Sequence, residues 1–266
     1  MKEGAILILK TGEALAPVRR SRGDFEDWIA RGLGLAVDAL EVVSAHRGEA
    51  LPAAQDLRGV VVTGSPAMVS ERADWSEDAA RWLAAIVEAD ALPVLGICYG
   101  HQLIAHGLGG EVGPNPRGRE MGTVDVRFDA GHDEDGGGAP SAGRKGSSGH
   151  PSHAVGAIEP LFRGSTTFPA HMSHVESVLR PPDGARVLAT TALDPHSVLA
   201  FGPRQWGVQF HPEFDREIMQ GYIEARRDIL ADEGIDPDRL IAGARDADAS
   251  GRVLARFAVL ADSGSD

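Results

Sequence analysis

The sequence predicts an α/β protein with three layers, α/β/α, in which a mostly parallel central sheet lies between two layers of helices. Short apolar runs, the pattern of strands buried on both faces, recur along the chain. Segments with apolar residues at helical spacing separate these runs, and this alternation favours parallel strands with helices on both faces of the sheet. The 266 residues are ample for a buried core, in one large domain or two small ones.

The first part of the chain alternates regularly between the two element types. Apolar runs predict strands over Ala5–Lys10 and over residues 40–45, 59–63 and 93–97. Helical periodicity predicts a helix that begins near Asp24 and further helices over residues 75–89 and 99–108.

The rest of the chain predicts further strands, partly antiparallel, followed by helices. The strands are expected over residues 122–128, 167–173, 186–190, 198–201 and 206–210, a helix over residues 215–231, and one or two helices over residues 236–260. We therefore expect one domain over residues 1–235. Residues 236–266 are expected to form a helical extension that braces this domain and frays from Ser263 onward.

Residues 131–156 differ in composition from the rest of the chain. They contain almost no large apolar side chain, so they cannot bury enough surface to offset the entropy of ordering. This predicts a flexible low-complexity insertion between strands. Potential metal ligands occur there at His132, Asp133, Asp135, His150 and His153, but a solvated loop is the favoured interpretation, and we predict no metal and no cofactor.

The net charge of −13 and the pI near 5.2 argue against nucleic acid and anionic membranes as partners. No apolar run approaches the length of a membrane span, and the first ten residues turn polar too early for a signal peptide. The single cysteine permits no internal disulfide. Together these features favour a cytoplasmic protein.

The cysteine, Cys98, lies between a predicted strand and a predicted helix, with Gly96 and Gly100 beside it. This pattern predicts a nucleophile elbow, a sharp turn that holds a reactive side chain clear of the sheet. Such a turn strains the cysteine and brings its neighbours close together, which requires small flanking residues. The helix N-terminus also favours a thiolate there. The alternative is a buried structural cysteine.

Further along the chain, the apolar run 206–210 ends in His211-Pro212-Glu213. A cysteine nucleophile needs a base, and the base needs a group that orients it. Because residues two apart in an extended chain point the same way, Glu213 is placed to hold His211. Alone, this tripeptide would be read as an ordinary turn at a strand end. With Cys98 it predicts a cysteine–histidine–glutamate triad.

A third segment supplies donors for an oxyanion. The strand over residues 59–63 runs into Gly64-Ser65-Pro66, and a glycine can turn its amide outward without steric cost. Acyl transfer needs backbone N–H groups at the developing oxyanion. We expect these groups to come from Gly64 and from Tyr99, the residue after the nucleophile.

Together these segments resemble the class I (triad-type) glutamine amidotransferases, with their G-[IV]-C-x-G-x-Q and H-P-E motifs. The resemblance covers residues 4–230 and is greatest to stand-alone members related to the glutaminase domain of GMP synthetase, with plant γ-glutamyl peptidases nearby. It implies a flavodoxin-like three-layer fold and no cofactor. It also implies that Ser65, Gln102, Ser173, His174 and Glu176 bind the substrate. The family pattern S-H-x-D-x-V has aspartate where this chain has Glu176.

The resemblance implies hydrolysis of the side-chain amide of L-glutamine through a γ-glutamyl thioester on Cys98. Either a separate synthetase subunit would accept the ammonia, or the protein would work alone. One alternative is a γ-glutamyl peptidase, which would use the same machinery on a γ-glutamyl peptide or conjugate. An alternative of another class is a catalytically silent regulatory or binding subunit, against which the intact Cys98, His211 and Glu213 argue.

Overall fold

The computed structural model describes residues 4–128, 160–162 and 166–263. Within these residues, nine strands form one sheet in the order β2-β1-β3-β4-β11-β10-β9-β6-β7. The five parallel strands are β2 (Glu41–Ser44), β1 (Ala5–Lys10), β3 (Leu57–Val62), β4 (Val94–Ile97) and β11 (Gln205–Val208). The antiparallel strands that follow are β10 (Val198–Ala200), β9 (Arg186–Thr190), β6 (Glu120–Phe128) and β7 (Thr167–His174).

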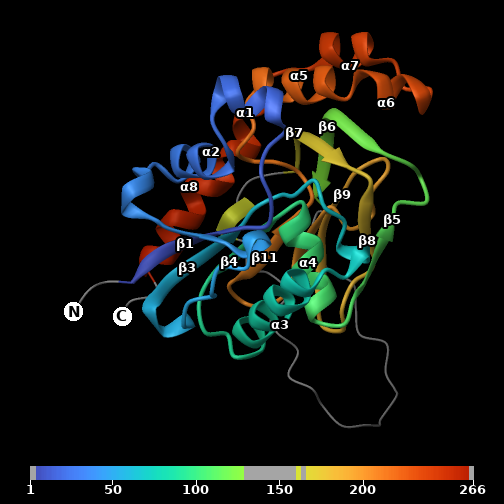
Figure 1. Cartoon of the computed structure of the whole chain (residues 1–266). Helices are drawn as coiled ribbons and strands as arrows, with labels where there is room; N and C mark the ends of the chain where they lie inside the picture. The colour runs from blue at the N-terminus through green and yellow to red at the C-terminus, as the bar shows by residue number, and fades with distance from the viewer. Residues whose placement is uncertain (1–3, 129–159, 163–165, 264–266) are drawn as a thin grey trace, which may run out of the picture.

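Helices cover both faces of this sheet (Figure 1). One face packs on α3 (Asp74–Glu88) and α4 (Tyr99–Gly107), and the other on α1 (Ala16–Arg22), α2 (Phe25–Leu33), α5 (Arg216–Ala225) and α8 (Asp248–Ser263). Strand β1 shows why, because Ile6 and Ile8 enter one apolar cluster while Leu7 and Leu9 enter the other. The predicted α/β/α fold class is confirmed.

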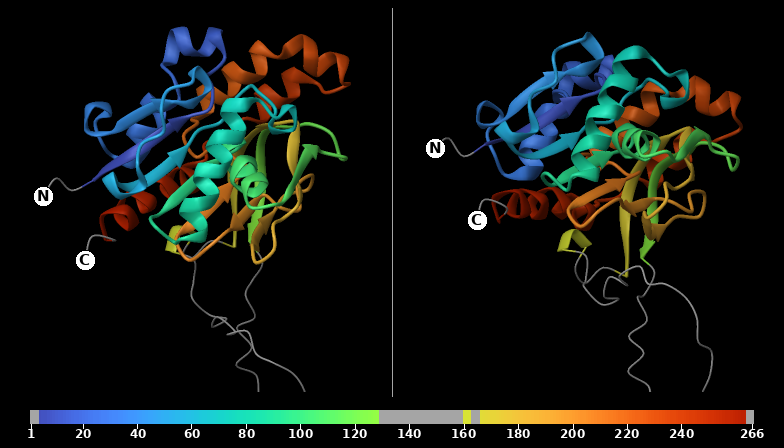
Figure 2. Two further views of the ribbon diagram at one scale, coloured as in Figure 1. Left: turned by 60° about the horizontal axis from the view of Figure 1, so that its bottom comes forward. Right: turned by 90° about the horizontal axis from the view of Figure 1, so that it is seen from below.

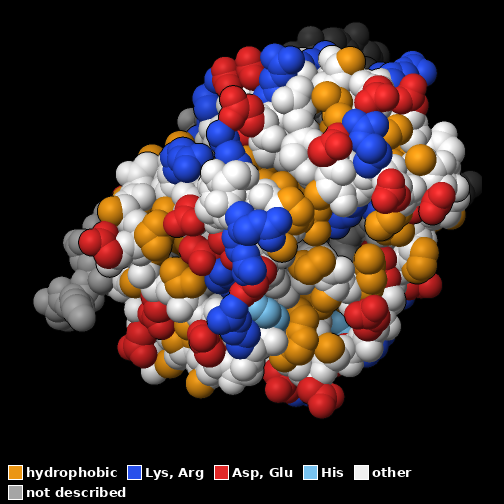
Figure 3. Space-filling model, turned by 45° about the horizontal axis from the view of Figure 1, so that its top comes forward, with side chains coloured by type: hydrophobic (Ala, Val, Ile, Leu, Met, Phe, Trp, Pro, Cys, Tyr) orange, Lys and Arg blue, Asp and Glu red, His pale blue; other side chains and the backbone are white. Residues whose placement is uncertain are grey.

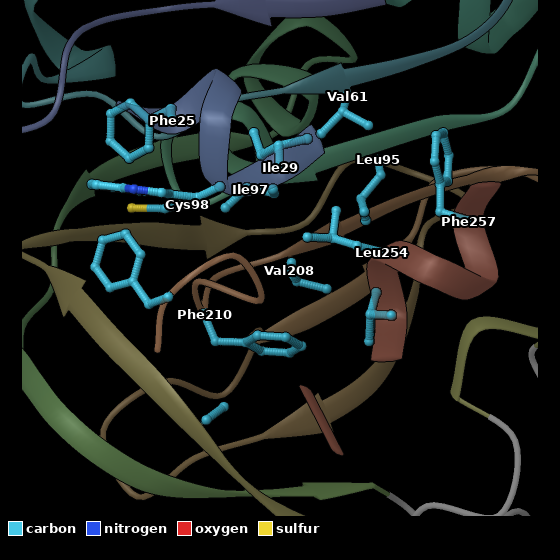
Figure 4. Packing of buried hydrophobic residues seen from close by; sticks show 14 of the residues in the cluster. Phe25, Ile29, Val61, Leu95, Ile97, Cys98, Val208, Phe210, Leu254 and Phe257 are labelled. Atoms are coloured by element: carbon cyan, nitrogen blue, oxygen red, sulfur yellow. The ribbon is translucent and has the colours of Figure 1, made fainter. Parts of the chain in front are cut away.

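The C-terminal helix α8 contributes to the same core as the sheet. Figure 2 shows it lying along the face opposite α3 and α4, and Figure 4 shows Leu254 and Phe257 near Val61, Leu95 and Val208. Helix α8 includes Ser263, the first residue of the tail expected to fray, and its hydroxyl donates a hydrogen bond to Val259 O at 2.8 Å. Residues 264–266 lie outside the described part.

Several elements differ from those predicted. Helix α1 was not expected, because it offers only Val18 to the core and shows no apolar stripe. A small second sheet of β5 (Glu111–Pro114) and β8 (Glu176–Arg180) was also missed. The helix predicted over residues 215–231 is broken at Arg226, whose backbone (φ −115°, ψ 14°) leaves the helical region and separates α5 from α6 (Arg227–Asp232).

The remaining described elements are α7 (Pro237–Gly243) and short 3₁₀ turns at Val37–Ala39, Ala45–Arg47, Ala54–Asp56, Val69–Glu71 and Pro160–Phe162. The predicted insertion over residues 131–156, with its candidate metal ligands, lies outside the described residues. No described helix is both long and apolar enough to cross a membrane.

Candidate active site

The predicted site segments meet at one edge of the sheet. Strands β3, β4 and β11 are neighbours and run parallel, so their carboxyl ends lie side by side. Gly64 follows β3, Cys98 follows β4 and His211 follows β11. Ligands of open α/β sheets bind at this edge.

Cys98 lies in the strained turn that the sequence predicts. Its φ of 49° and ψ of −100° are conformations that L-residues rarely adopt. The flanking glycines are required. A Cβ on Gly96 would lie 2.6 Å from the backbone of Gly100, and one on Gly100 would lie 2.6 Å from Val62 O. Cys98 is 5% exposed and borders the apolar cluster beside Phe25 (Figure 4).

His211 and Glu213 form a buried pair. His211 Nδ1 lies 2.7 Å from Glu213 Oε1, and the Glu213 side chain is fully buried. The local geometry differs from the extended chain we expected. Strand β11 ends at Val208, and the segment turns so that Phe214 N donates to His211 O at 3.3 Å. The turn still brings the carboxylate to the imidazole.

Charge governs the protonation of His211. Burial alone lowers the pKa of this imidazole, but the electrostatic interactions with Glu213 and Cys98 outweigh burial and raise the pKa to about 10. A side-chain hydrogen bond with Cys98 acts in the same direction. Cys98, His211 and Glu213 therefore interact in the order that a triad requires.

Two aromatic residues at the site go beyond the predicted set. Phe214 stacks on the His211 ring with centroids 4.1 Å apart, and Phe25 lies parallel to the same ring at 6.4 Å. The imidazole is thus held between two rings, which restricts its rotation. Phe214 directly follows Glu213 in the sequence, whereas nothing local in the sequence connects Phe25 with His211.

Gly64 lies against the imidazole. A Cβ on Gly64 would approach His211 Cε1 to 2.9 Å, so this position accepts no side chain without displacement. Hydrogen bonds between Thr11 and Thr63 fix the turn: Thr11 N donates to Thr63 Oγ1 at 3.1 Å and Thr11 Oγ1 donates to Thr63 O at 2.9 Å. Among the described residues, the Gly64 N–H has no hydrogen-bond partner.

Tyr99 is anchored to α3. Its hydroxyl lies 2.6 Å from Ser76 Oγ, and its ring stacks on Trp75 at 5.7 Å. Burial raises the pKa of the phenol to about 12, so the phenol stays neutral. The backbone N–H of Tyr99, like that of Gly64, has no hydrogen-bond partner in the described part of the chain. Both predicted oxyanion donors are therefore available and held by their surroundings.

Three of the predicted substrate-binding residues meet at one backbone carbonyl, that of Glu176. Gln102 Nε2 donates to this oxygen at 2.7 Å, and His174 Nδ1 lies 2.9 Å from it. The Glu176 carboxylate accepts from Ser70 N at 3.3 Å. All three side chains are buried, and Gln102 and His174 together hold the Glu176 carbonyl in place.

The other two predicted substrate-binding residues differ in their hydrogen bonding. Ser65 Oγ donates to Thr11 O at 2.7 Å and accepts from Ala67 N at 3.1 Å, so it ties its own turn to the segment that follows β1. Ser173 Oγ is buried and has no partner among the described residues. No group of three metal-ligating side chains occurs in the described ranges.

The fold and these residues define a class: a three-layer α/β protein with a cysteine elbow and a histidine–glutamate pair at the carboxyl edge of a parallel sheet. The family model described as "Glutamine amidotransferase class-I" matches residues 23–226. The chain belongs to this family.

Several similar proteins carry the name GMP synthase (glutamine-hydrolyzing). The protein from Aeropyrum pernix is 38% identical over 202 residues, which are 73% of this chain and 32% of that protein. The protein from Leifsonia xyli subsp. xyli is 32% identical over 220 residues, 79% of this chain and 38% of that protein. The chain thus spans no more than 38% of the length of these two relatives.

Solved structures share the fold across nearly the whole chain. A glutamine amidotransferase from Thermotoga maritima matches with a TM-score of 0.67 and 20% identity, over 97% of both chains. A glutamine amido transferase from Methylobacillus flagellatus matches with a TM-score of 0.67 and 19% identity, over 98% of this chain and 95% of that one. At such identities the likeness supports the fold.

Proposed function

We propose that this protein hydrolyses the side-chain amide of L-glutamine through a γ-glutamyl thioester on Cys98. The observation that carries the proposal is the strained Cys98 (φ 49°) together with the buried His211–Glu213 pair at 2.7 Å. A cysteine with only a structural role would need neither the strained backbone nor a buried histidine–glutamate pair. The names of the curated relatives, glutamine-hydrolysing GMP synthases, support the same reaction.

In the first half of the reaction, the Cys98 thiolate attacks the side-chain carbonyl carbon and forms a C–S bond. The carbonyl oxygen becomes an oxyanion, which the N–H groups of Gly64 and Tyr99 stabilise. His211, whose pKa of about 10 keeps it protonated at neutral pH, gives its proton to the leaving nitrogen. The C–N bond breaks, and ammonia leaves the γ-glutamyl thioester.

In the second half, neutral His211 takes a proton from water, and the oxygen attacks the thioester carbon. The C–S bond breaks, glutamate is released and the thiolate–imidazolium pair returns. Glu213 orients the imidazole throughout. Gln102, Ser173, His174 and Glu176 would contact the glutamine head group, and Ser65 would shape the oxyanion turn.

The ammonia would serve an acceptor on a synthetase subunit or be released. The relatives named as GMP synthases make a synthetase partner the first candidate. The acceptor itself is a separate question from the hydrolysis.

A γ-glutamyl peptidase is the second candidate function, and one feature favours it. A groove of about 450 Å³ adjoins the oxyanion turn, a size within the range of small-molecule sites. Its lining includes Thr11, Ser65, His46, Arg47 and Trp75. The second candidate requires that the leaving group of a γ-glutamyl peptide extend from Cys98 into this groove.

The test is the release of ammonia and glutamate from L-glutamine by the purified protein, with Cys98→Ala as control. Release that disappears in the variant supports the proposal. Absence of release, with Cys98 still alkylated by iodoacetamide, contradicts a self-sufficient glutaminase. Release of amino acids from γ-glutamyl peptides would then establish the second candidate.

A further inference from the structure

Arg226 is a half-buried arginine at the break between α5 and α6. Its guanidinium carbon lies 5.5 Å from the centroid of the Tyr222 ring, over the face of that ring. This cation–π contact holds the side chain in place. Nη1 is buried and makes no hydrogen bond, and the guanidinium forms no ion pair with any residue of the described part.

Neighbouring arginines differ from Arg226 because each has its own carboxylate. Arg119 binds both oxygens of Glu233, at 2.7 and 2.8 Å. Arg227 lies 2.7 Å from Glu224 and 2.9 Å from an oxygen of Asp238. Basic and acidic side chains are interleaved over this side of the molecule (Figure 3), yet these local carboxylates are occupied.

An unpaired, partly desolvated charge is costly for a folded protein. Burial lowers the pKa of Arg226, which is the direct expression of that cost. A guanidinium matches a carboxylate with two parallel hydrogen bonds. No carboxylate of the described residues forms this pair with Arg226.

The location connects Arg226 with the catalytic residues. Tyr222 packs on Phe214 with ring centroids 4.6 Å apart, and Phe214 stacks on His211 at 4.1 Å. Among the charges that act on Arg226, the Cys98 thiolate raises its pKa. The rings of Tyr222 and Phe214 thus connect the guanidinium with the imidazole of His211.

We propose that Arg226 anchors a carboxylate-binding site on the Tyr222–Phe214 side of His211 and that it binds a carboxylate of the γ-glutamyl substrate. The assignment to substrate rests on the proposed function. The carboxylate is either the α-carboxylate of the γ-glutamyl group or one on the leaving group, as in a γ-glutamyl amino acid. Both present the same chemistry to the arginine.

The first test needs no catalytic activity. Cys98 is the only cysteine, and its sulfur displaces iodide from either iodoacetate or iodoacetamide. The ratio of the two alkylation rates reports attraction of the carboxylate, because any change in thiolate content affects both reagents equally. We expect Arg226→Gln to lower this ratio about tenfold, the effect of losing one charge-assisted hydrogen bond.

Arg227→Gln is the matched control, because Arg227 is adjacent, carries the same charge and is ion-paired. Its ratio should stay within about twofold of the unchanged protein. Arg226→Lys, which keeps the charge, should retain part of the preference, and unfolding midpoints verify that the variants fold. An unchanged ratio in Arg226→Gln, or an equal fall in Arg227→Gln, would overturn the proposal.

The second test locates the carboxylate by comparing KM for L-glutamine, γ-glutamylglycine and γ-glutamylethylamide. A higher KM for all three in Arg226→Gln assigns the α-carboxylate, and a higher KM for γ-glutamylglycine alone assigns the leaving group. No change in any KM overturns the role in substrate binding. If no substrate is turned over while the alkylation ratio still depends on Arg226, the proposed function fails and the carboxylate site stands.

Discussion

Replacing Glu213 by glutamine removes the charge behind His211 and changes little else. The two side chains are of equal size, and the carboxylate is fully buried at 2.7 Å from the imidazole. A hydrogen bond to a charged group contributes about 1.5–3 kcal/mol. At about 1.4 kcal/mol for each factor of ten in rate, this corresponds to a kcat about 10- to 150-fold lower. KM should change little, because Glu213 faces the base and not the substrate.

The assay is ammonia release from L-glutamine at saturating and limiting concentrations. The same substitution at Glu217, which is 70% exposed and contacts Arg22, is the control and should leave kcat within about twofold. Because the Glu213 carboxylate is the chief charge that raises the pKa of His211, an NMR titration should place that pKa well below 10 in Glu213→Gln. A normal kcat, or a loss confined to KM, would refute Glu213 as the orienting group.

Three other predictions concern stability. A Cβ on Gly100 would lie 2.6 Å from a backbone oxygen of β3, so Gly100→Ala should cost about 1–3 kcal/mol of folding free energy. Each kcal/mol lost should lower Tm by about 2–4 °C. Gly243→Ala, with no atom within 4 Å of the new Cβ, should leave Tm unchanged. Equal Tm shifts in the two variants would contradict the predicted clash at Gly100. Phe257→Ala in α8 should cost about 3–5 kcal/mol in a denaturant titration, whereas Val259→Ala, at a 65% exposed site, should cost less than about 0.5 kcal/mol; a small loss at both would show that α8 does not stabilise the core. Finally, His211 has a pKa of about 10 when folded against 6.5 for the ordinary group, so its protonation stabilises the fold fully below pH 6.5 and progressively less as the pH rises to 10. Denaturant titrations across this range should show the decline, and His211→Gln should lack that part of it; an identical decline would assign it to other groups.

Local features of the site were predictable because they depend on a few consecutive residues. The elbow at Cys98 requires Gly96 and Gly100 for steric reasons that a strand-to-helix turn already contains. The turn at Gly64 and the contact between His211 and Glu213 are likewise local. The fold class followed from apolar runs and helical periodicity, which are also local.

Short and weakly patterned elements were not predictable in the same way. Helix α1 buries one side chain, Val18, and β5 and β8 pair only with each other. The break at Arg226 leaves no trace in the apolar pattern, because residues on both sides of it continue the helical spacing. In each case tertiary contacts outweigh local preference.

The fold class, most of the regular elements, the strained turn at Cys98 and the contact of His211 with Glu213 could be predicted from the sequence, because sterics and hydrophobic periodicity act over a few residues. Which distant groups meet depends on tertiary packing. The parallel pairing of Val208 with Ile97 brings His211 to Cys98, and α2 brings Phe25 against the imidazole. The same packing leaves Arg226 without a carboxylate next to arginines that have one. Such contacts depend on strand order and helix packing, which follow from the burial of the whole chain and not from any one segment.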